Sequence, residues 1–181
     1  MKQWIGYYKD VVSHETCDSI MSEDWKWKSS TYSSNKGEIE NSSNRVVMDD
    51  CWITEKMKYW KPLLDTTQEV IKLYKARHSC MKYFNPNRTT DFRVNKYSGG
   101  GFMSEHIDNI HHSHGQQYGY PSASCLYFLN DDYEGGEIVI ADIMYKPEKG
   151  SAIIFPSNFM FPHYVDRVTK GERYSIITWL M

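Results

Sequence analysis

Residues 92–108 read FRVNKYSGGGFMSEHID, two β-rich runs separated by the turn Ser98-Gly99-Gly100-Gly101. The same alternation continues to the C-terminus, where short runs rich in β-branched and aromatic residues are divided by glycine-containing turns. Short strands at this spacing are typical of an all-β sandwich or barrel, and they do not fit βαβ units. The expected strands are Phe92–Tyr97, Met103–Asp108, Ser122–Asn130, Glu137–Asp142, Ser151–Phe155, His163–Val168 and Arg173–Leu180.

The sequence before this region has helical signals. Ser13 is a suitable N-cap for a first helix that runs to Met21. Thr54 is a suitable cap for a second segment, which Pro62 should end or kink, and Asp65 then caps a third. Short strands are also expected at Trp27–Tyr32 and Arg45–Met48. The fold is therefore predicted to be mainly β, with N-terminal helices packed on the outside of a barrel.

Length and charge limit the classes of protein that remain. The 181 residues indicate one domain, with helical support over about residues 1–80 and a barrel over about 90–181. Mean hydropathy is −0.63 and the net charge is −2, so neither a nucleic-acid nor a membrane partner is expected. MKQWIGYYKD at the N-terminus lacks the apolar core of a signal peptide. We therefore expect a soluble, cytoplasmic enzyme or binding module.

His106-Ile107-Asp108 is a candidate metal site. On a strand, residues two apart project from the same face, so the imidazole and the carboxylate would converge. His163, which begins a later predicted strand, is the candidate third ligand. Two histidines and one carboxylate leave one side of a metal open, as in non-haem Fe(II) oxygenases. Taken alone, the motif favours the simpler interpretation of two solvated polar residues at a strand end.

Arg173 supplies the context that favours the metal interpretation. It lies in Gly171-Glu172-Arg173-Tyr174-Ser175, and on the strand that follows it shares a face with Ser175. A guanidinium and a hydroxyl in this arrangement can bind a carboxylate, the guanidinium in a bidentate way. The competing interpretation is a solvent-facing charge beside a turn.

These features lie within a longer pattern. Over about Phe92 to Trp179 the chain resembles the Fe(II)/2-oxoglutarate-dependent dioxygenases, specifically the prolyl 4-hydroxylase branch. Four ordered segments carry the resemblance: the Tyr97 and Gly-rich turn before His106-Ile107-Asp108, residues 126–137 (LYFLNDDYEGGE), residues 149–155 (KGSAIIF), and residues 163–179 with His163, Arg173 and Trp179.

The resemblance implies a double-stranded β-helix, or jelly-roll, barrel, and it implies roles for individual residues. His106, Asp108 and His163 would bind iron. Arg173, helped by Ser175, would bind the C5 carboxylate of 2-oxoglutarate. Tyr97 stands where the family has a tyrosine that lines the cosubstrate pocket.

Two positions depart from the common family pattern. Met103 and Phe128 stand where many members have tyrosines. Each substitution removes a hydroxyl that could contact 2-oxoglutarate, so the polar contacts of the cosubstrate should differ from those of such members.

The resemblance also implies an activity. The expected reaction hydroxylates prolyl residues in a peptide or protein, in the manner of procollagen or peptidyl-proline 4-hydroxylases. It consumes O2 and decarboxylates 2-oxoglutarate to succinate and CO2, with Fe(II) as the cofactor and ascorbate as a possible reductant.

Two other functions stay open at this point. One is an oxygenase of the same fold that acts on a small molecule or a nucleic acid. The nucleic-acid demethylase branch typically has a second arginine six residues after the first, where this chain has Trp179. The other is a noncatalytic jelly-roll binding module, which would not need both an iron site and an anion clamp.

Three further groups of residues have two competing interpretations or lie beside the candidate site. His111, His112 and His114 could form a second metal site, but a loop at the rim of the site is the favoured interpretation. Trp25, Trp27 and Tyr32 could line a peptide groove, although packing in the core is favoured. Trp179 shares the strand face of Arg173 and should border the site.

Overall fold

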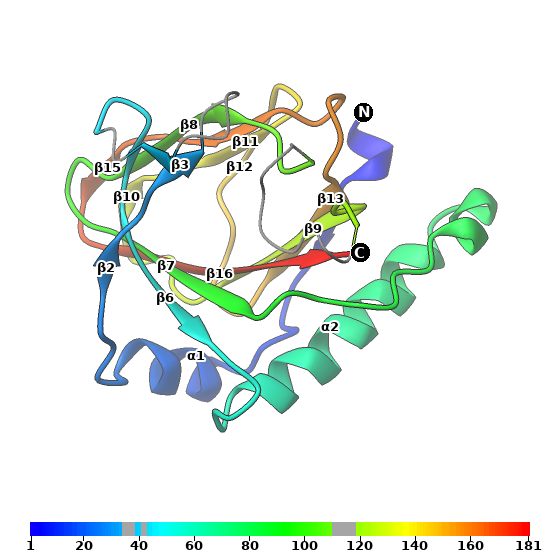
Figure 1. Ribbon diagram of the computed structural model, residues 1–181, viewed down its shortest axis with the longest axis horizontal. Helices are drawn as coiled ribbons and strands as arrows, with labels where there is room; N and C mark the ends of the chain where they lie inside the picture. The colour runs from blue at the N-terminus through cyan, green and yellow to red at the C-terminus, as the bar shows by residue number, and fades with distance from the viewer. Residues whose placement is uncertain (34–38, 41–42, 110–118) are drawn as a thin grey trace.

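In the computed structural model, residues 1–33, 39–40, 43–109 and 119–181 are described. Two antiparallel sheets face each other and enclose a barrel interior (Figure 1). The larger sheet has seven strands in the order β1 (Gly6–Tyr8), β13 (Ala152–Pro156), β9 (Ala123–Phe128), β16 (Arg173–Leu180), β7 (Phe92–Tyr97), β6 (Asp49–Ile53) and β2 (Lys28–Ser29).

The smaller sheet has five strands and forms the opposite wall of the barrel (Figure 1). Its order is β12 (Ile143–Tyr145), β11 (Ile138–Ile140), β14 (His163–Val165), β8 (Phe102–His106) and β5 (Val46–Val47). Two short pairs complete the described strands: β10 (Glu134–Gly135) with β15 (Val168–Lys170), and β3 (Tyr32–Ser33) with β4 (Ile39–Glu40). The architecture is the double-stranded β-helix that the sequence predicts.

Alternation along the strands of the larger sheet divides its side chains between two cores. On β9, Cys125 and Tyr127 pack toward the helices, whereas Leu126 and Phe128 pack into the barrel interior. Such strands are buried on both faces and therefore read as continuous apolar runs.

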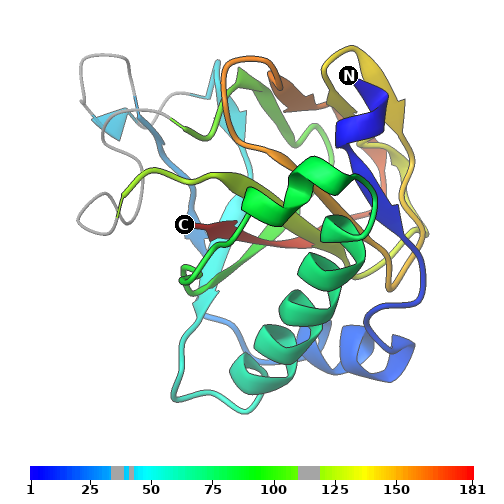
Figure 2. The same cartoon turned by 90° about the vertical axis from the view of Figure 1, so that its right-hand side faces the viewer.

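The helices cover the outer face of the larger sheet (Figure 2). They are α1 (His14–Met21) and α2 (Trp60–Lys75), with short 3-10 helices η1 (Lys2–Trp4) and η2 (Ser79–Tyr83). As predicted, Ser13 caps α1, because its Oγ accepts a hydrogen bond from the Thr16 N–H at 3.1 Å. No helix among the described residues has both the length and the apolar character needed to span a bilayer.

The prediction of two helices divided at Pro62 is wrong. One helix, α2, begins at Trp60, and Pro62 is its third residue. A proline is tolerated in the first turn, because the N–H that it lacks would have no partner inside the helix. Residues 1–80 also supply strands to both sheets. Of these strands, β1 and β6 were not predicted. β6 begins with Asp49 and Asp50, and acidic residues are atypical of a strand.

Candidate active site

The candidate metal residues meet at the facing ends of two neighbouring strands. His106 is the last residue of β8, His163 is the first of β14, and the two are direct cross-strand partners. β8 ends before Asp108, which lies in the following bend, so the prediction of a strand through Asp108 is wrong. Strand alternation therefore does not place the carboxylate, and a hydrogen bond from a third strand holds it instead.

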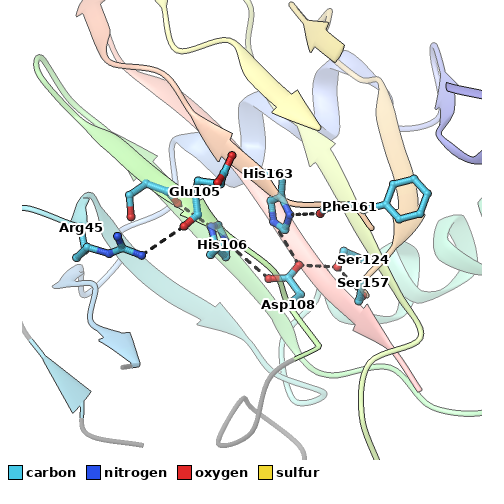
Figure 3. Close-up of polar contacts among 9 residues, drawn as sticks. Arg45, Glu105, His106, Asp108, Ser124, Ser157, Phe161 and His163 are labelled. Carbon is cyan, nitrogen blue, oxygen red and sulfur yellow. Dashed lines mark hydrogen bonds and ion pairs between the residues drawn. The ribbon is translucent and has the colours of Figure 1, made fainter. Parts of the chain in front are cut away.

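The three side chains converge on one point (Figure 3). His106 Nε2 lies 3.6 Å from Asp108 Oδ1, and His163 Nε2 lies 3.5 Å from Asp108 Oδ2. One ligand atom from each residue lies within 4.8 Å of the other two. Two imidazole nitrogens and a carboxylate oxygen at this separation fit a single divalent metal ion.

Backbone carbonyls orient both imidazoles. His106 Nδ1 donates to the Ser104 carbonyl at 2.8 Å, and His163 Nδ1 donates to the Phe161 carbonyl at 3.1 Å. A carbonyl can only accept, so each Nδ1 carries the proton and each Nε2 lone pair points to the shared space. This is the usual second contact of a metal-binding histidine.

One serine that the sequence analysis missed holds the carboxylate, and a second serine contacts the first. Ser124 Oγ, on β9, donates to Asp108 Oδ2 at 2.5 Å and lies 2.8 Å from Ser157 Oγ (Figure 3). Ser124 and Ser157 are fully buried. The only sequence signal for Ser124 is a hydroxyl at an inward-facing position of an otherwise apolar strand, and this signal does not name its partner.

The electrostatics of the cluster favour the protonation states that bind metal. Burial, together with the neighbouring His163, lowers the pKa of His106 to about 4. Burial alone would raise the pKa of Asp108, but His163, His106 and the Ser124 hydrogen bond outweigh it and keep that pKa below its usual value. At neutral pH the cluster therefore offers a neutral His106 imidazole beside an ionised carboxylate.

Arg173 supplies a second feature, deeper in the barrel. It is completely buried at the start of β16, and its Cζ lies 5.0 Å from the Tyr97 ring and 5.4 Å from the Phe128 ring. Nη1 donates to Ser175 Oγ at 3.0 Å. Nε and Nη2 are buried without a hydrogen-bond partner in the described part of the chain. A buried cation with spare donors fits an anionic ligand.

Tyr133 is a further residue that the sequence analysis missed. Its hydroxyl is buried without a hydrogen-bond partner among the described residues. Burial raises its pKa, and the charge of Arg173 opposes that shift, which places the phenol beside the guanidinium. A Cβ at Gly136, which has φ +65°, would lie 3.0 Å from Arg173 Cδ and 3.2 Å from the Tyr133 ring. Gly136 therefore leaves room for both side chains. Tyr133 also contributes a hydroxyl beside Arg173, whereas the side chains of Met103 and Phe128 carry no hydroxyl.

The remaining predicted residues fall into three groups. Trp179 lies on the inner face of β16 and borders the site, and its hydrogen bond helps to lower the pKa of Asp108. Trp25 and Trp27 pack against the helix-side core, in line with the favoured interpretation. The His111, His112 and His114 loop and the Tyr32 side chain lie outside the described residues.

A family comparison bears on this arrangement. The sequence profile of the 2OG-Fe(II) oxygenase superfamily matches residues 92–181, which contain every residue of the metal cluster and the Arg173 pocket. The chain belongs to the 2OG-Fe(II) oxygenase superfamily. The cluster and the buried guanidinium fit the two groups after which this superfamily is named, Fe(II) and 2-oxoglutarate.

Curated relatives of the oxygenase include PKHD-type hydroxylases. One from Stenotrophomonas maltophilia (strain R551-3) is 34% identical over 134 residues, which are 66% of this chain and 56% of the relative. Another, from Rippkaea orientalis, is 29% identical over 143 residues, 75% of this chain and 61% of the relative. The chain thus spans about three-fifths of the length of the curated relatives that it matches.

Solved structures show the same fold. A prolyl-4-hydroxylase from Pseudomonas putida superposes with a TM-score of 0.74 at 14% identity, covering 98% of this chain and 91% of that one. A prolyl hydroxylase from Trichoplax adhaerens, in complex with a hypoxia inducible factor peptide fragment, gives 0.73 at 16% identity, covering 99% and 84%. At these identities the likeness establishes the architecture of the oxygenase and leaves its substrate open.

Proposed function

We propose that this oxygenase hydroxylates prolyl residues in a peptide or protein, with O2 and 2-oxoglutarate as cosubstrates. One oxygen atom would enter the prolyl C–H bond, and the other would leave in succinate as 2-oxoglutarate loses CO2. The observation that carries the proposal is the His106, Asp108 and His163 cluster in the same barrel interior as the unpaired guanidinium of Arg173. A binding module would not need both.

In this proposal His106, Asp108 and His163 hold the metal. Bound Fe(II) supplies O2 activation coupled to the oxidative decarboxylation of 2-oxoglutarate, and through it the oxidising power for an unactivated C–H bond. The protein keeps the two histidine ligands oriented through the Ser104 and Phe161 carbonyls. Buried apolar neighbours such as Phe155, whose ring centroid lies 4.9 Å from that of His163, exclude water.

Arg173 binds and orients the cosubstrate in the same proposal. Its free Nε and Nη2 donors would receive the C5 carboxylate, while Ser175 holds Nη1. Tyr97 lies across the guanidinium on the neighbouring strand, as its register partner. Since no carboxylate of the described chain pairs with Arg173, a carboxylate ligand satisfies a charge that is otherwise costly to bury.

The choice of a prolyl substrate rests on two comparisons and one physical argument. The structural neighbours include prolyl hydroxylases, one of them with a bound peptide fragment, and the curated relatives are named hydroxylases. Proline in an extended peptide has a fixed φ, so less conformational entropy is lost on binding. The PKHD-type name of the sequence relatives is the reason to test other hydroxyl acceptors beside proline.

The test is a substrate panel with the Fe(II)-loaded protein, 2-oxoglutarate and ascorbate. We expect proline-containing peptides to stimulate succinate release, and mass spectrometry to find hydroxyproline in them. Free proline, free lysine and methylated oligonucleotides serve as alternatives, and His163→Ala serves as the inactive control. Stimulation by a free amino acid or an oligonucleotide alone would overturn the prolyl-peptide assignment.

A further inference from the structure

The barrel interior contains a second arginine that the proposed chemistry does not use. Arg93 lies on β7, where Arg93, Asn95 and Tyr97 alternate along the strand and so share one face. Tyr97 on this face belongs to the interior core, whereas Phe92 and Val94 on the other face pack toward the helices. The side chain of Arg93 is therefore directed into the barrel.

Aromatic side chains surround this guanidinium. Arg93 Cζ lies 5.0 Å from the Trp179 ring centroid, and Trp52 is its direct cross-strand partner on β6. The Trp52 and Trp179 rings are 6.4 Å apart. The two indoles and the guanidinium together form one wall, which we call the Arg93 wall.

The guanidinium has hydrogen-bonding capacity to spare. Arg93 Nε is buried and has no hydrogen-bond partner among residues 1–33, 39–40, 43–109 and 119–181. Within the same residues Arg93 forms no ion pair, and Asp50 stands opposite Asn95 rather than opposite Arg93. Stacking on Trp179 uses none of the five N–H donors of an arginine. A purely structural cation–π contact would leave the buried Nε donor unsatisfied, which is unfavourable.

The Arg93 wall adjoins the metal cluster on the side away from the cosubstrate pocket. Trp179 connects the Arg93 wall with the metal cluster, because its ring lies against the Arg93 guanidinium and its side chain hydrogen-bonds to Asp108. The pairing of β16 with β7 shows that the two arginines lie apart along the strands. Arg173 is opposite Tyr97, whereas Arg93 is opposite Ile177, four residues further along β16. Four residues along a strand correspond to about 13 Å. The two guanidiniums therefore belong to different positions of the barrel interior, and Arg93 stays free for a second anion when Arg173 receives 2-oxoglutarate.

We propose that Arg93 is a substrate-recognition residue that binds a carboxylate of an acidic peptide next to the prolyl residue to be hydroxylated. The proposal rests on the proposed function and names the kind of peptide it acts on. A guanidinium binds a carboxylate through two parallel hydrogen bonds, and the buried Arg93 Nε, which has no partner among the described residues, can supply one of them. Trp52 and Trp179 provide the apolar surface against which a pyrrolidine ring can pack.

The test compares two fluorescently labelled peptides that differ only in a Glu or a Gln beside proline. Binding is measured by anisotropy to the Fe(II)- and 2-oxoglutarate-loaded protein without O2, so the readout does not depend on turnover. We expect the wild type to bind the Glu peptide at least tenfold more tightly, and Arg93→Gln to abolish this preference while 2-oxoglutarate affinity is unchanged. Arg77→Gln, on an exposed arginine at the end of α2, removes the same charge and should keep the preference.

Arg93→Met and Arg93→Lys guard against a folding defect. Met preserves much of the side-chain volume and should behave as Gln does, whereas Lys keeps the charge and should retain part of the preference. Equal binding of both peptides by the wild type, or a Glu preference that survives in Arg93→Gln, would overturn the inference. Failure of the proposed function gives a different result: the Glu peptide would still bind through Arg93 but would not become hydroxylated when O2 is added.

Discussion

At the scale of single residues, the cosubstrate pocket depends on one buried charge. Arg173 has two donors without a partner in the described chain, so its removal should leave the carboxylate of 2-oxoglutarate unpaired. We expect Arg173→Ala to raise the KM for 2-oxoglutarate strongly, by the equivalent of about 2–5 kcal/mol. Arg173→Lys should keep part of the activity, since a point charge remains but the planar fork is lost. Steady-state succinate assays measure both, and an unchanged KM in Arg173→Ala would place the carboxylate elsewhere.

Tyr133 gives a second prediction for the same pocket. Its buried, unpaired hydroxyl lies beside Arg173 and would donate to the same carboxylate. Tyr133→Phe should weaken 2-oxoglutarate binding by about 1 kcal/mol, the usual worth of one hydrogen bond, with little change in the melting temperature. Isothermal titration of 2-oxoglutarate against the metal-loaded protein gives the affinity. Tyr83→Phe, at a tyrosine that is 81% exposed, is the matched control. Equal affinities of the two variants would exclude Tyr133 from the pocket.

The third prediction at this scale concerns the orientation of Asp108. Ser124 donates to the carboxylate, so Ser124→Ala should loosen it and weaken Fe(II) binding, with an effect of about tenfold. Ser124→Thr keeps a hydroxyl and should restore part of the affinity. Metal titration followed by the absorption of Co(II) as a spectroscopic substitute reports geometry without turnover. Identical Co(II) spectra and affinities in wild type and Ser124→Ala would show that the serine does not position the ligand.

These residues show what a sequence can predict of a site. His106 and Asp108 were predicted from their spacing on one strand, and His163 and Arg173 from the resemblance of residues 163–179 to the family pattern. Ser124 and Tyr133 were missed because their roles depend on partners brought together by long-range strand pairing. A lone serine in an apolar strand and a tyrosine in an acidic turn have no local pattern that names those partners.

At the scale of secondary-structure elements, the docking of α2 on the larger sheet includes one buried polar contact. Thr67 Oγ1 donates to the Leu63 carbonyl at 2.7 Å and lies 2.6 Å from the Tyr127 hydroxyl of β9, which therefore donates to it. Both side chains are fully buried. The contact fixes the position of the helix on a strand that also carries Ser124, and thus connects the helical layer with the wall of the site.

This contact predicts an asymmetric pair of substitutions. Thr67→Val removes the oxygen that accepts from the buried Tyr127 hydroxyl and leaves it only the weaker Cys125 thiol as a partner, so it should cost about 1–3 kcal/mol of unfolding free energy. Tyr127→Phe leaves Thr67 bonded to Leu63 and should cost less, about 0.5–1.5 kcal/mol. The double variant should recover part of the loss of Thr67→Val. Urea unfolding measures all three, and strictly additive costs would contradict the coupling.

The elements also differ in how well the sequence predicts them. β7 and β16 have the predicted bounds because each is a β-rich run bordered by turn residues. α2 was divided at Pro62, because proline is expected to break a helix unless its position in the first turn is known. β6 was missed because its acidic first residues gain strand geometry only by pairing with β7. Tertiary pairing decides such cases, and local propensity does not.

At the scale of the whole molecule, the metal cluster connects the two sheets of the barrel. His106 and His163 come from the smaller sheet, and Asp108 is held by Ser124 of the larger one. A metal ion bound by all three would therefore stabilise the folded state over the unfolded chain. At a free concentration one hundred times its Kd, a ligand specific for the folded state adds about 2.7 kcal/mol.

The last prediction follows from this linkage. For a chain of this size, about 2.7 kcal/mol corresponds to a rise in melting temperature of roughly 5–10 °C. We expect Fe(II), added without O2, to produce this rise in the wild type and in His14→Ala, whose histidine is exposed on α1. His163→Ala should lose it, whatever its own melting temperature, because the comparison is between metal-free and metal-loaded forms of each variant. A full metal-dependent rise in His163→Ala would show that the ion binds outside the cluster, and would remove the physical basis for assigning the three residues as its ligands.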